Sequence, residues 1–399
     1  MRTRAFRFVL PLAAILAALA IAEVALRLSG FGASTVYLHA GMLRHHPLLG
    51  WEKKPSARAV YEFEGKTIVE TSNRDGFRGP ARPREKPPGE FRVLALGDSF
   101  CEGYLVGDGE VFSAVLERNW QNSRKLSVLN AGVAGYSTDQ QLIYFRETGV
   151  MYQPGVTVVF FFDNDVWFNT QLDEYRSKKP RFVLSEGGLA IDGLPVPPPP
   201  ERAASAAPAS GGFFRDHFRL AQLIAERAAR IPWLQTGSIP PPDAQAPQPE
   251  AAATAPSRLP GEFKVYLREQ PEDIREAWRL TEAILHELKR GAEAAGGRLA
   301  VFYVPTAAAI YPQAWEAAKR RWGLNGEEWS IEQVEPMLAA VCERQGIDFI
   351  PAIAPLREIA GQPEFASSRL YYLEDGHWNA AGHAAAAEIL RQYLSSLNP

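Results

Sequence analysis

The sequence predicts an α/β fold built on a mainly parallel sheet of five strands. Five short apolar runs alternate with amphipathic helical stretches, and hydrophobicity within each run is continuous rather than alternating. A strand covered by helices on both faces needs continuous apolar character, and helical connections imply parallel pairing. The predicted strands are residues 92–96, 126–129, 156–162, 299–304 and 347–350. The predicted helices are residues 140–147, 272–295, 331–345 and 380–394.

The N-terminus predicts export in one of two forms. Three arginines precede an apolar stretch over residues 8–26, so the positive-inside rule keeps this flank in the cytoplasm and sends the remaining chain across the membrane. We predict that residues 1–30 form an uncleaved membrane anchor, because the stretch is long enough to span a bilayer. The alternative is a cleaved signal peptide with its cleavage site at residues 20–22. Either form predicts a periplasmic or other extracytoplasmic location.

Two further segments surround the sheet in the predicted domain order. Residues 31–90 contain short strand-like pieces and turn signals, which predict a small β-rich N-terminal subdomain. Residues 91–399 form the predicted α/β domain. It is interrupted at residues 195–260 by an insertion that holds 14 of the 31 prolines and is too poor in apolar residues to join the core, apart from a predicted helix at 213–234.

Composition excludes several classes of partner. The chain has 43 Lys and Arg against 46 Asp and Glu, so no basic excess is available to neutralise nucleic acid. Two cysteines are too few for a disulfide framework. His45 and His46 lack a third ligand at metal spacing. The sequence therefore predicts no nucleic-acid partner, no metal and no cofactor.

Four polar clusters carry the candidate chemistry. They are Gly97-Asp98-Ser99, the glycine-rich run at 130–138, Asp163-Asn164-Asp165 and the C-terminal run at 374–377. Taken singly, each could be an ordinary turn or a polar cap on a buried strand. The first three follow predicted parallel strands, whose carboxyl ends share one edge of the sheet, and the fourth supplies a histidine from a loop. This set predicts a nucleophile, oxyanion donors and a general base at that edge.

The order of these clusters resembles the SGNH hydrolases, also called GDSL esterases and lipases. Ser99 matches the nucleophile block, Gly135 the glycine block, Asn164 the asparagine block and His377 the last block. The resemblance implies a three-layer α/β/α fold of flavodoxin-like type. It also implies that His377 activates Ser99 and that an oxyanion hole forms from the N–H groups of Ser99 and Gly135 and from the Asn164 amide.

The sequence departs from the family pattern at three places. Phe162 replaces a glycine two residues before the asparagine, which predicts a narrower pocket. The family spacing would make Glu374 the triad acid. However, Asp375 lies two residues before His377 and shares its side of an extended stretch, so we predict Asp375 and keep Glu374 as the alternative. Trp378 replaces a frequent proline and could present an aromatic wall.

Other residues attract attention for weaker reasons. Cys101 follows the nucleophile by two positions, and a small core residue is a better account of it than a second nucleophile. Trp315, Trp322 and Trp329 are spaced by seven, but two intervening glycines break any shared helix. Core packing is the simplest account of these tryptophans, and a platform for stacking sugars is the alternative.

The sequence therefore predicts an exported serine esterase that hydrolyses a small acyl ester, such as acetyl, on a cell-envelope glycan. An acyl-enzyme on Ser99 is the expected intermediate. One alternative is an O-acyltransferase that uses the same serine chemistry. Another is a non-catalytic envelope scaffold or glycan-binding protein that has kept the fold.

Overall fold

The structure is a computed structural model that describes residues 41–174, 177–199, 259–324, 326–365, 369–372 and 375–397, together with Leu19, Ala22 and Glu23. The chain divides into two compact units. The larger comprises residues 39–61, 67–199 and 256–399 and holds the sheet. The smaller comprises residues 1–38, 62–66 and 200–255, and few of these are described.

Two predictions fall mostly on residues that are not described. The predicted membrane segment at 1–30 is described at only three positions, and the predicted helix at 213–234 is outside the described residues. Of the helices in the described part of the chain, none combines the length and apolar character needed to cross a membrane.

The five-stranded parallel sheet confirms the predicted fold class. Its order is β13-β12-β7-β5-β6, and all neighbouring strands are parallel. Every residue of β5 is buried, as continuous apolar sequence predicts for a strand covered on both faces. The strands are β5 (Glu90–Gly97), β6 (Lys125–Asn130), β7 (Val156–Phe162), β12 (Arg298–Val304) and β13 (Asp348–Ile350).

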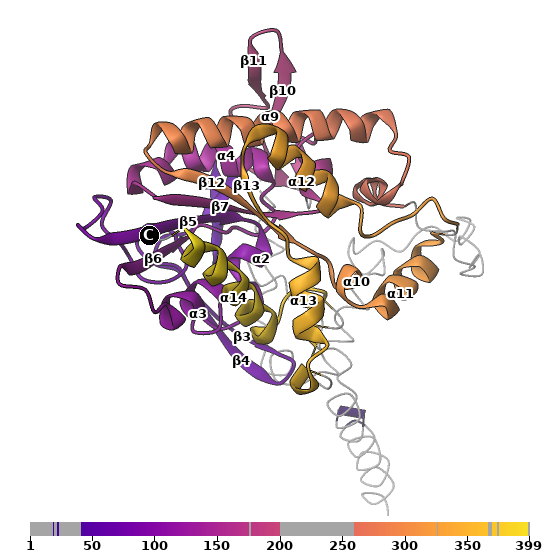
Figure 1. The fold of residues 1–399 in the computed structure, drawn as a ribbon, viewed down its shortest axis with the longest axis horizontal. Coiled ribbons are helices and arrows are strands. Elements are labelled where there is room, and N and C mark those ends of the chain that lie inside the picture. Colours follow the sequence, from indigo (N-terminus) through magenta and orange to yellow (C-terminus); the bar gives the residue numbers. More distant parts are fainter. Residues whose placement is uncertain are drawn as a thin grey trace, which may run out of the picture. The chain divides into compact units, whose positions relative to one another are not determined.

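Helices cover both faces of this sheet and make three layers (Figure 1). One face carries α4, α9 and α12, and the other carries α3, α13 and α14. The α-helices are α2 (Ser99–Glu102), α3 (Phe112–Asn119), α4 (Thr138–Glu147), α5 (Asp165–Phe168), α9 (Glu272–Ala294), α10 (Ala307–Ile310), α11 (Pro312–Trp322), α12 (Val334–Gln345), α13 (Ile353–Ala360) and α14 (Ala380–Ser396). Three 3-10 turns are η2 (Gly149–Tyr152), η3 (Gly261–Tyr266) and η4 (Pro363–Phe365).

The strand order reverses beside β5. The chain passes from β5 to its neighbour β6 and then returns across β5 to form β7 on the other side. In open parallel sheets, the ligand crevice lies beyond the carboxyl ends of the strands at such a switch point. The segment that follows β5 therefore occupies the position expected for a site.

Short antiparallel pairs lie outside the main sheet. The predicted strand pieces at 60–63 and 67–70 are found within β3 and β4. The pairs β1–β2, β8–β9 and β10–β11 were not predicted from the sequence. The bounds are β1 (Leu43–His46), β2 (Gly50–Lys53), β3 (Arg58–Phe63), β4 (Lys66–Thr71), β8 (Asp173–Glu174), β9 (Ser177–Lys178), β10 (Arg181–Ser185) and β11 (Gly188–Asp192).

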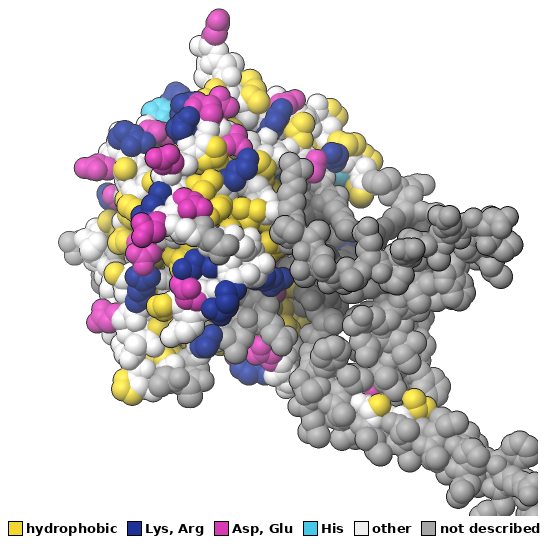
Figure 2. Space-filling view, turned by 90° about the vertical axis from the view of Figure 1, so that its right-hand side faces the viewer, with side chains coloured by type: hydrophobic (Ala, Val, Ile, Leu, Met, Phe, Trp, Pro, Cys, Tyr) yellow, Lys and Arg dark blue, Asp and Glu magenta, His cyan; other side chains and the backbone are white. Residues whose placement is uncertain are grey.

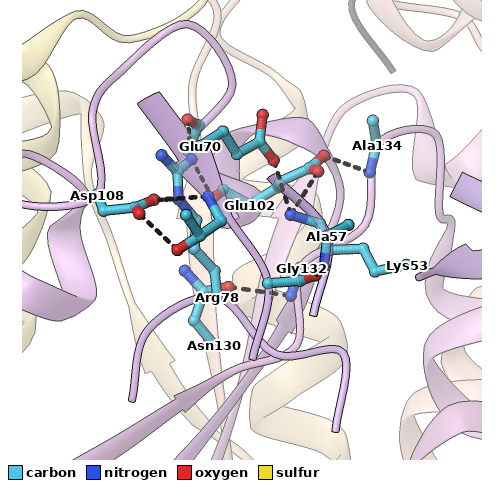
Figure 3. A network of polar contacts seen from close by, with 12 residues as sticks. Lys53, Ala57, Glu70, Arg78, Glu102, Asp108, Asn130, Gly132 and Ala134 are labelled. Carbon is cyan, nitrogen blue, oxygen red and sulfur yellow. Dashed lines mark hydrogen bonds and ion pairs between the residues drawn. The ribbon is translucent and has the colours of Figure 1, made fainter. Parts of the chain in front are cut away.

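Buried charges tie the N-terminal strands to the segment after β5 (Figure 3). Lys53 Nζ lies 2.9 Å from Glu70 Oε1 and 2.6 Å from Glu102 Oε1, and all three side chains are almost fully buried. Burial alone would lower the pKa of Lys53, but Glu102 and Glu70 raise it above its ordinary value. Removing one member of a buried ion pair leaves an uncompensated charge, so this cluster fixes how β2 and β4 meet α2.

Charges of both signs are mixed on the surface seen in Figure 2. Basic and acidic side chains alternate over the described part of that face, with apolar side chains between them. The described part of this face therefore presents no patch of a single sign.

Candidate active site

Ser99 begins the short helix α2 directly after β5. Asp98 caps this helix, because its Oδ1 accepts the Phe100 N–H at 2.9 Å. Burial raises the pKa of Asp98 to about 6. Gly103 ends the helix in the left-handed conformation with φ of 83°. The turn therefore holds Ser99 at the carboxyl edge of the sheet, and Asp98 stabilises the turn.

His377 lies against this serine from a loop that precedes α14. Its Nε2 is 2.7 Å from Ser99 Oγ, although the two residues are 278 positions apart in the sequence. Its Nδ1 is hydrogen-bonded to Asp375 Oδ1, which also accepts the His377 N–H at 3.2 Å. Gly376 between them has φ of 89°, a conformation that glycine adopts easily. The structure thus joins serine, histidine and aspartate in one chain of hydrogen bonds.

The alternative acid, Glu374, is outside the described residues. Both hydrogen bonds between His377 and the Asp375 carboxylate are made possible by the tight turn at Gly376, which lies between the two residues. This is the arrangement that the sequence favoured for an acid two residues before the histidine.

Aromatic rings pack around the serine and histidine. Phe100 lies 4.8 Å from the His377 ring and 4.8 Å from Phe162, and Tyr104 lies 4.9 Å from the His377 ring. Phe162 therefore lies close to the turn that carries Ser99. Trp378 does not form the suggested wall, because it is fully buried beneath Phe100 at 5.2 Å. Its size suits a core position better than a pocket lining.

The glycine-rich loop after β6 packs closely against α2. A Cβ atom on Gly132 would lie 2.2 Å from the Glu102 nitrogen, so only glycine permits this approach. Asn130 joins the same two segments: its Nδ2 donates to the Cys101 carbonyl at 2.7 Å and its Oδ1 accepts the Gly132 N–H at 3.0 Å. Tight packing therefore places the glycine loop beside the serine.

One main-chain donor in this loop has no acceptor in the described part of the chain. Between residues 131 and 137, the amide N–H groups of all residues except Gly135 donate to protein acceptors within the described residues. Gly135 is buried, has φ of 77°, and follows Ala134, whose N–H donates to Glu102 Oε2 at 2.7 Å (Figure 3). A buried N–H without an acceptor costs free energy unless a ligand supplies one. Gly135 therefore has the properties of an oxyanion donor.

Asn164 follows β7, on the other side of β5 from the glycine loop. Gly97 pairs in register with Phe160, so the ends of β5 and β7 lie side by side. Asn164 is half-buried, and its amide makes no hydrogen bond to any described residue. The strands that precede Gly135 and Asn164, the two donors that the sequence predicted, thus flank the strand that precedes Ser99.

Two buried carboxyl groups flank Asn164. Asp163 accepts hydrogen bonds from the hydroxyls of Tyr303 at 2.6 Å and Tyr266 at 2.7 Å, and burial raises its pKa to about 7. Burial also raises the pKa of Asp165 well above its ordinary value, and its Oδ1 has no hydrogen-bond partner among the described residues. Burial thus disfavours the charged form of the Asp165 carboxyl beside Asn164.

Residues outside the four clusters complete the site. The glycine loop is contacted directly by Glu102 and Trp51, and Lys53 reaches it through its ion pair with Glu102. Sequence analysis missed them because each acts across a long sequence separation. The one local signal was Glu102, an acidic residue in the first turn of the short helix that Ser99 begins.

The remaining candidates have structural explanations. Cys101 is fully buried, and burial raises its pKa well above the ordinary value, so it is a poor nucleophile. The described residues contain no group of three His, Cys, Asp or Glu side chains able to hold a metal. Trp315 and Trp322 belong to α11, which has no buried residue, so core packing was the wrong account of them. Trp329 lies beyond the helix, as its glycines predicted.

No model of a protein family matches the chain, and no curated protein sequence does. Among solved structures, the chain is similar to a GDSL-like lipase from Bacteroides thetaiotaomicron, with 12% identity and a TM-score of 0.36 over 77% of this chain and 89% of the lipase. A mutant acetylxylan esterase from Geobacillus stearothermophilus has 12% identity and a TM-score of 0.38 over 75% of this chain and 92% of the esterase. The case for a function rests on the geometry of this chain.

We expect Asp163→Asn to remove a pH-dependent loss of stability. The pKa of Asp163 is about 7 when folded, against roughly 4 in an unfolded chain. The folded state therefore binds more protons between these values, and the free energy of unfolding falls as pH rises through this window. Asparagine does not titrate. As the pH rises, the free energy of unfolding of the wild type should therefore fall relative to that of the variant by up to about 1.4 kcal/mol per pH unit, and then level off.

Urea unfolding at intervals between about pH 4 and pH 8 measures this difference. Asp173→Asn, at a carboxylate that is 59% exposed, is the matched control. Parallel stability curves for wild type and Asp163→Asn would contradict the assignment.

Proposed function

We propose that this protein is an exported serine esterase that cleaves a small acyl group from a glycan. The observation that carries the proposal is the hydrogen-bonded chain Ser99–His377–Asp375 at the same sheet edge as Gly135 and Asn164, two donors that have no acceptor among the described residues. Each group follows a different strand or loop, yet all meet where the strand order reverses. This arrangement suits attack on a carbonyl and stabilisation of the resulting anion.

The reaction follows from these positions. His377 Nε2 accepts the proton of Ser99 Oγ as that oxygen bonds to the ester carbon. Asp375 fixes the tautomer of His377 and stabilises the imidazolium. The carbon–oxygen bond of the alcohol then breaks, and the alcohol leaves with the proton from His377. The acyl group remains on Ser99 until water, deprotonated by His377, repeats the attack and releases the acid.

The oxyanion is stabilised by donors that are already in place. The N–H groups of Ser99 and Gly135 and the Asn164 amide have no acceptors to give up within the described residues. Losing one such donor typically raises the barrier by about 3–4 kcal/mol. Because the donors are held by packing, the reaction needs little reorganisation.

The size and class of the substrate are supported by two features. The rings of Phe100 and Phe162 pack against each other at 4.8 Å beside the serine turn, which supports a small acyl group. Trp315 and Trp322 are partly exposed, and partly exposed aromatic rings offer an apolar face to a sugar. The export signal predicted from the sequence would place the enzyme with envelope glycans.

We expect Ser99→Ala to abolish hydrolysis of a chromogenic acetyl ester. Loss of the nucleophile should lower turnover by roughly a thousandfold or more, and labelling by a fluorophosphonate should disappear. Ser185→Ala, at an exposed serine, is the control and should keep both properties. Labelling that persists in Ser99→Ala would refute the assignment of the nucleophile. An inactive wild type would refute the proposed function.

We expect Asp375→Asn to lower turnover by about three to four orders of magnitude without unfolding the protein. The amide cannot hold the tautomer of His377 that accepts the serine proton. Glu374→Gln should change turnover little, because Asp375 makes the hydrogen bonds to His377. Circular dichroism checks the folding of both variants. If Glu374→Gln lost activity while Asp375→Asn kept it, the acid would be Glu374.

The proposed location has its own test. A reporter enzyme that is active only outside the cytoplasm should be active when fused to the C-terminus, because the basic flank precedes the apolar stretch. Retention in membranes after washing with salt and carbonate would distinguish the anchor from a cleaved signal peptide. Activity only of a cytoplasmic reporter would overturn export and the envelope substrate.

A further inference from the structure

Trp51 makes a hydrogen bond to the peptide group that carries the Gly135 N–H. The indole Nε1–H of Trp51 donates to the Ala134 carbonyl at 3.0 Å, across 83 positions of sequence. The carbon of that carbonyl is bonded to the Gly135 nitrogen. Trp51 therefore contacts one end of the peptide group whose other end is the candidate oxyanion donor.

The geometry of a peptide sets the direction of this donor. The Ala134–Gly135 peptide is trans, so its carbonyl and its N–H point in opposite directions. A donor that holds the carbonyl on one side thus turns the N–H to the opposite side. Hydrogen bonds in a chain also polarise one another, so a bond accepted by the carbonyl makes the N–H a stronger donor.

Trp51 is itself held firmly in place. It lies in β2, is 9% exposed, and packs against the Tyr136 ring at 5.9 Å. The Tyr136 hydroxyl donates to the Trp51 carbonyl at 2.5 Å. Two residues later in the same strand, Lys53 pairs with Glu102, which accepts the Ala134 N–H (Figure 3). The strand therefore holds Ala134 at both its carbonyl and its amide.

We propose that Trp51 is a positioning residue of the oxyanion hole: its indole N–H orients and polarises the Ala134–Gly135 peptide so that Gly135 can donate to the developing anion. This inference rests on the proposed esterase function. It gives the N-terminal strand β2 a part in the reaction that the four sequence clusters do not include. Trp51 itself does not touch the reacting atoms.

Trp51→Phe tests this role, because phenylalanine keeps an aromatic ring against Tyr136 and removes only the donor. We expect kcat for the acetyl ester to fall by about tenfold while KM changes by less than about twofold, since the donor acts mainly on the anionic transition state. Trp278→Phe is the matched control: Trp278 is buried, and its Nε1 has no acceptor among the described residues. This control should leave kcat unchanged.

A second measurement does not depend on turnover. The ¹H and ¹⁵N shifts of the Gly135 amide should move in Trp51→Phe and stay constant in Trp278→Phe, because loss of the bond to the carbonyl changes the polarity of that N–H. If Trp51→Phe fails to fold, Tyr136→Phe, which frees the Trp51 main chain, should lower kcat in the same direction by a few-fold.

The outcomes separate this inference from the proposed function. An active wild type whose kcat is unchanged in Trp51→Phe, or in Tyr136→Phe where only that variant folds, would overturn the role of Trp51 and leave the esterase assignment intact. An inactive wild type would refute the esterase, and the Gly135 shift would still decide whether Trp51 holds the peptide. A fall in kcat of equal size in Trp278→Phe would also overturn the inference.

Discussion

The buried carboxylate of Glu102 joins the segments on which the candidate site depends. One oxygen pairs with Lys53 of β2, and the other accepts the Ala134 N–H of the glycine loop. Glu102 itself ends α2, the helix that Ser99 begins. The Glu102 side chain is 0% exposed, and a buried charge is tolerated only when it is paired and hydrogen-bonded. Separating any of the three segments would leave the Glu102 carboxylate without a partner and destabilise the fold. The turn that carries Ser99 and the loop that carries Gly135 are therefore linked through the Glu102 side chain.

The sequence was most informative where burial on both faces leaves a continuous apolar run. The predicted bounds of β7 match those observed, and those of β5, β6, β12 and β13 differ by two residues or fewer. The β10–β11 hairpin was missed because only Phe182 among its strand residues is buried, so the strands lack a continuous apolar run, and because its pairing is antiparallel. Its turn at Glu186-Gly187 was an available signal, since a short glycine turn between extended residues favours a hairpin.

The candidate site was predictable to the extent that local sequence marks it. Ser99, Gly135, Asn164 and His377 each stand at the end of a run or before a helix, where polar residues are conspicuous. The contact of Trp51 with Ala134 spans 83 positions and depends on how a short hairpin packs, which no local pattern reveals. For the same reason, the predicted boundary at residue 90 does not mark a gap in contacts: residues 39–61 and 67–199 form one unit with the sheet.

The Gly135 N–H and the Asn164 amide have no acceptor among the described residues. This explains why many buried polar side chains surround a small site. Leaving a buried N–H without an acceptor costs about 1–3 kcal/mol, and a loop free to move would turn such a group toward any nearby carbonyl. The Gly135 peptide cannot do so, because Trp51 holds its carbonyl and Glu102 holds the preceding amide. Arg78 adds two hydrogen bonds to these contacts. Its main-chain N–H donates to the Asn130 carbonyl at 3.0 Å, and its guanidinium donates to the Glu102 carbonyl at 3.0 Å. A division of the chain at residue 90 would cut through these contacts, so strands β1 and β2 belong to the same unit as the candidate site.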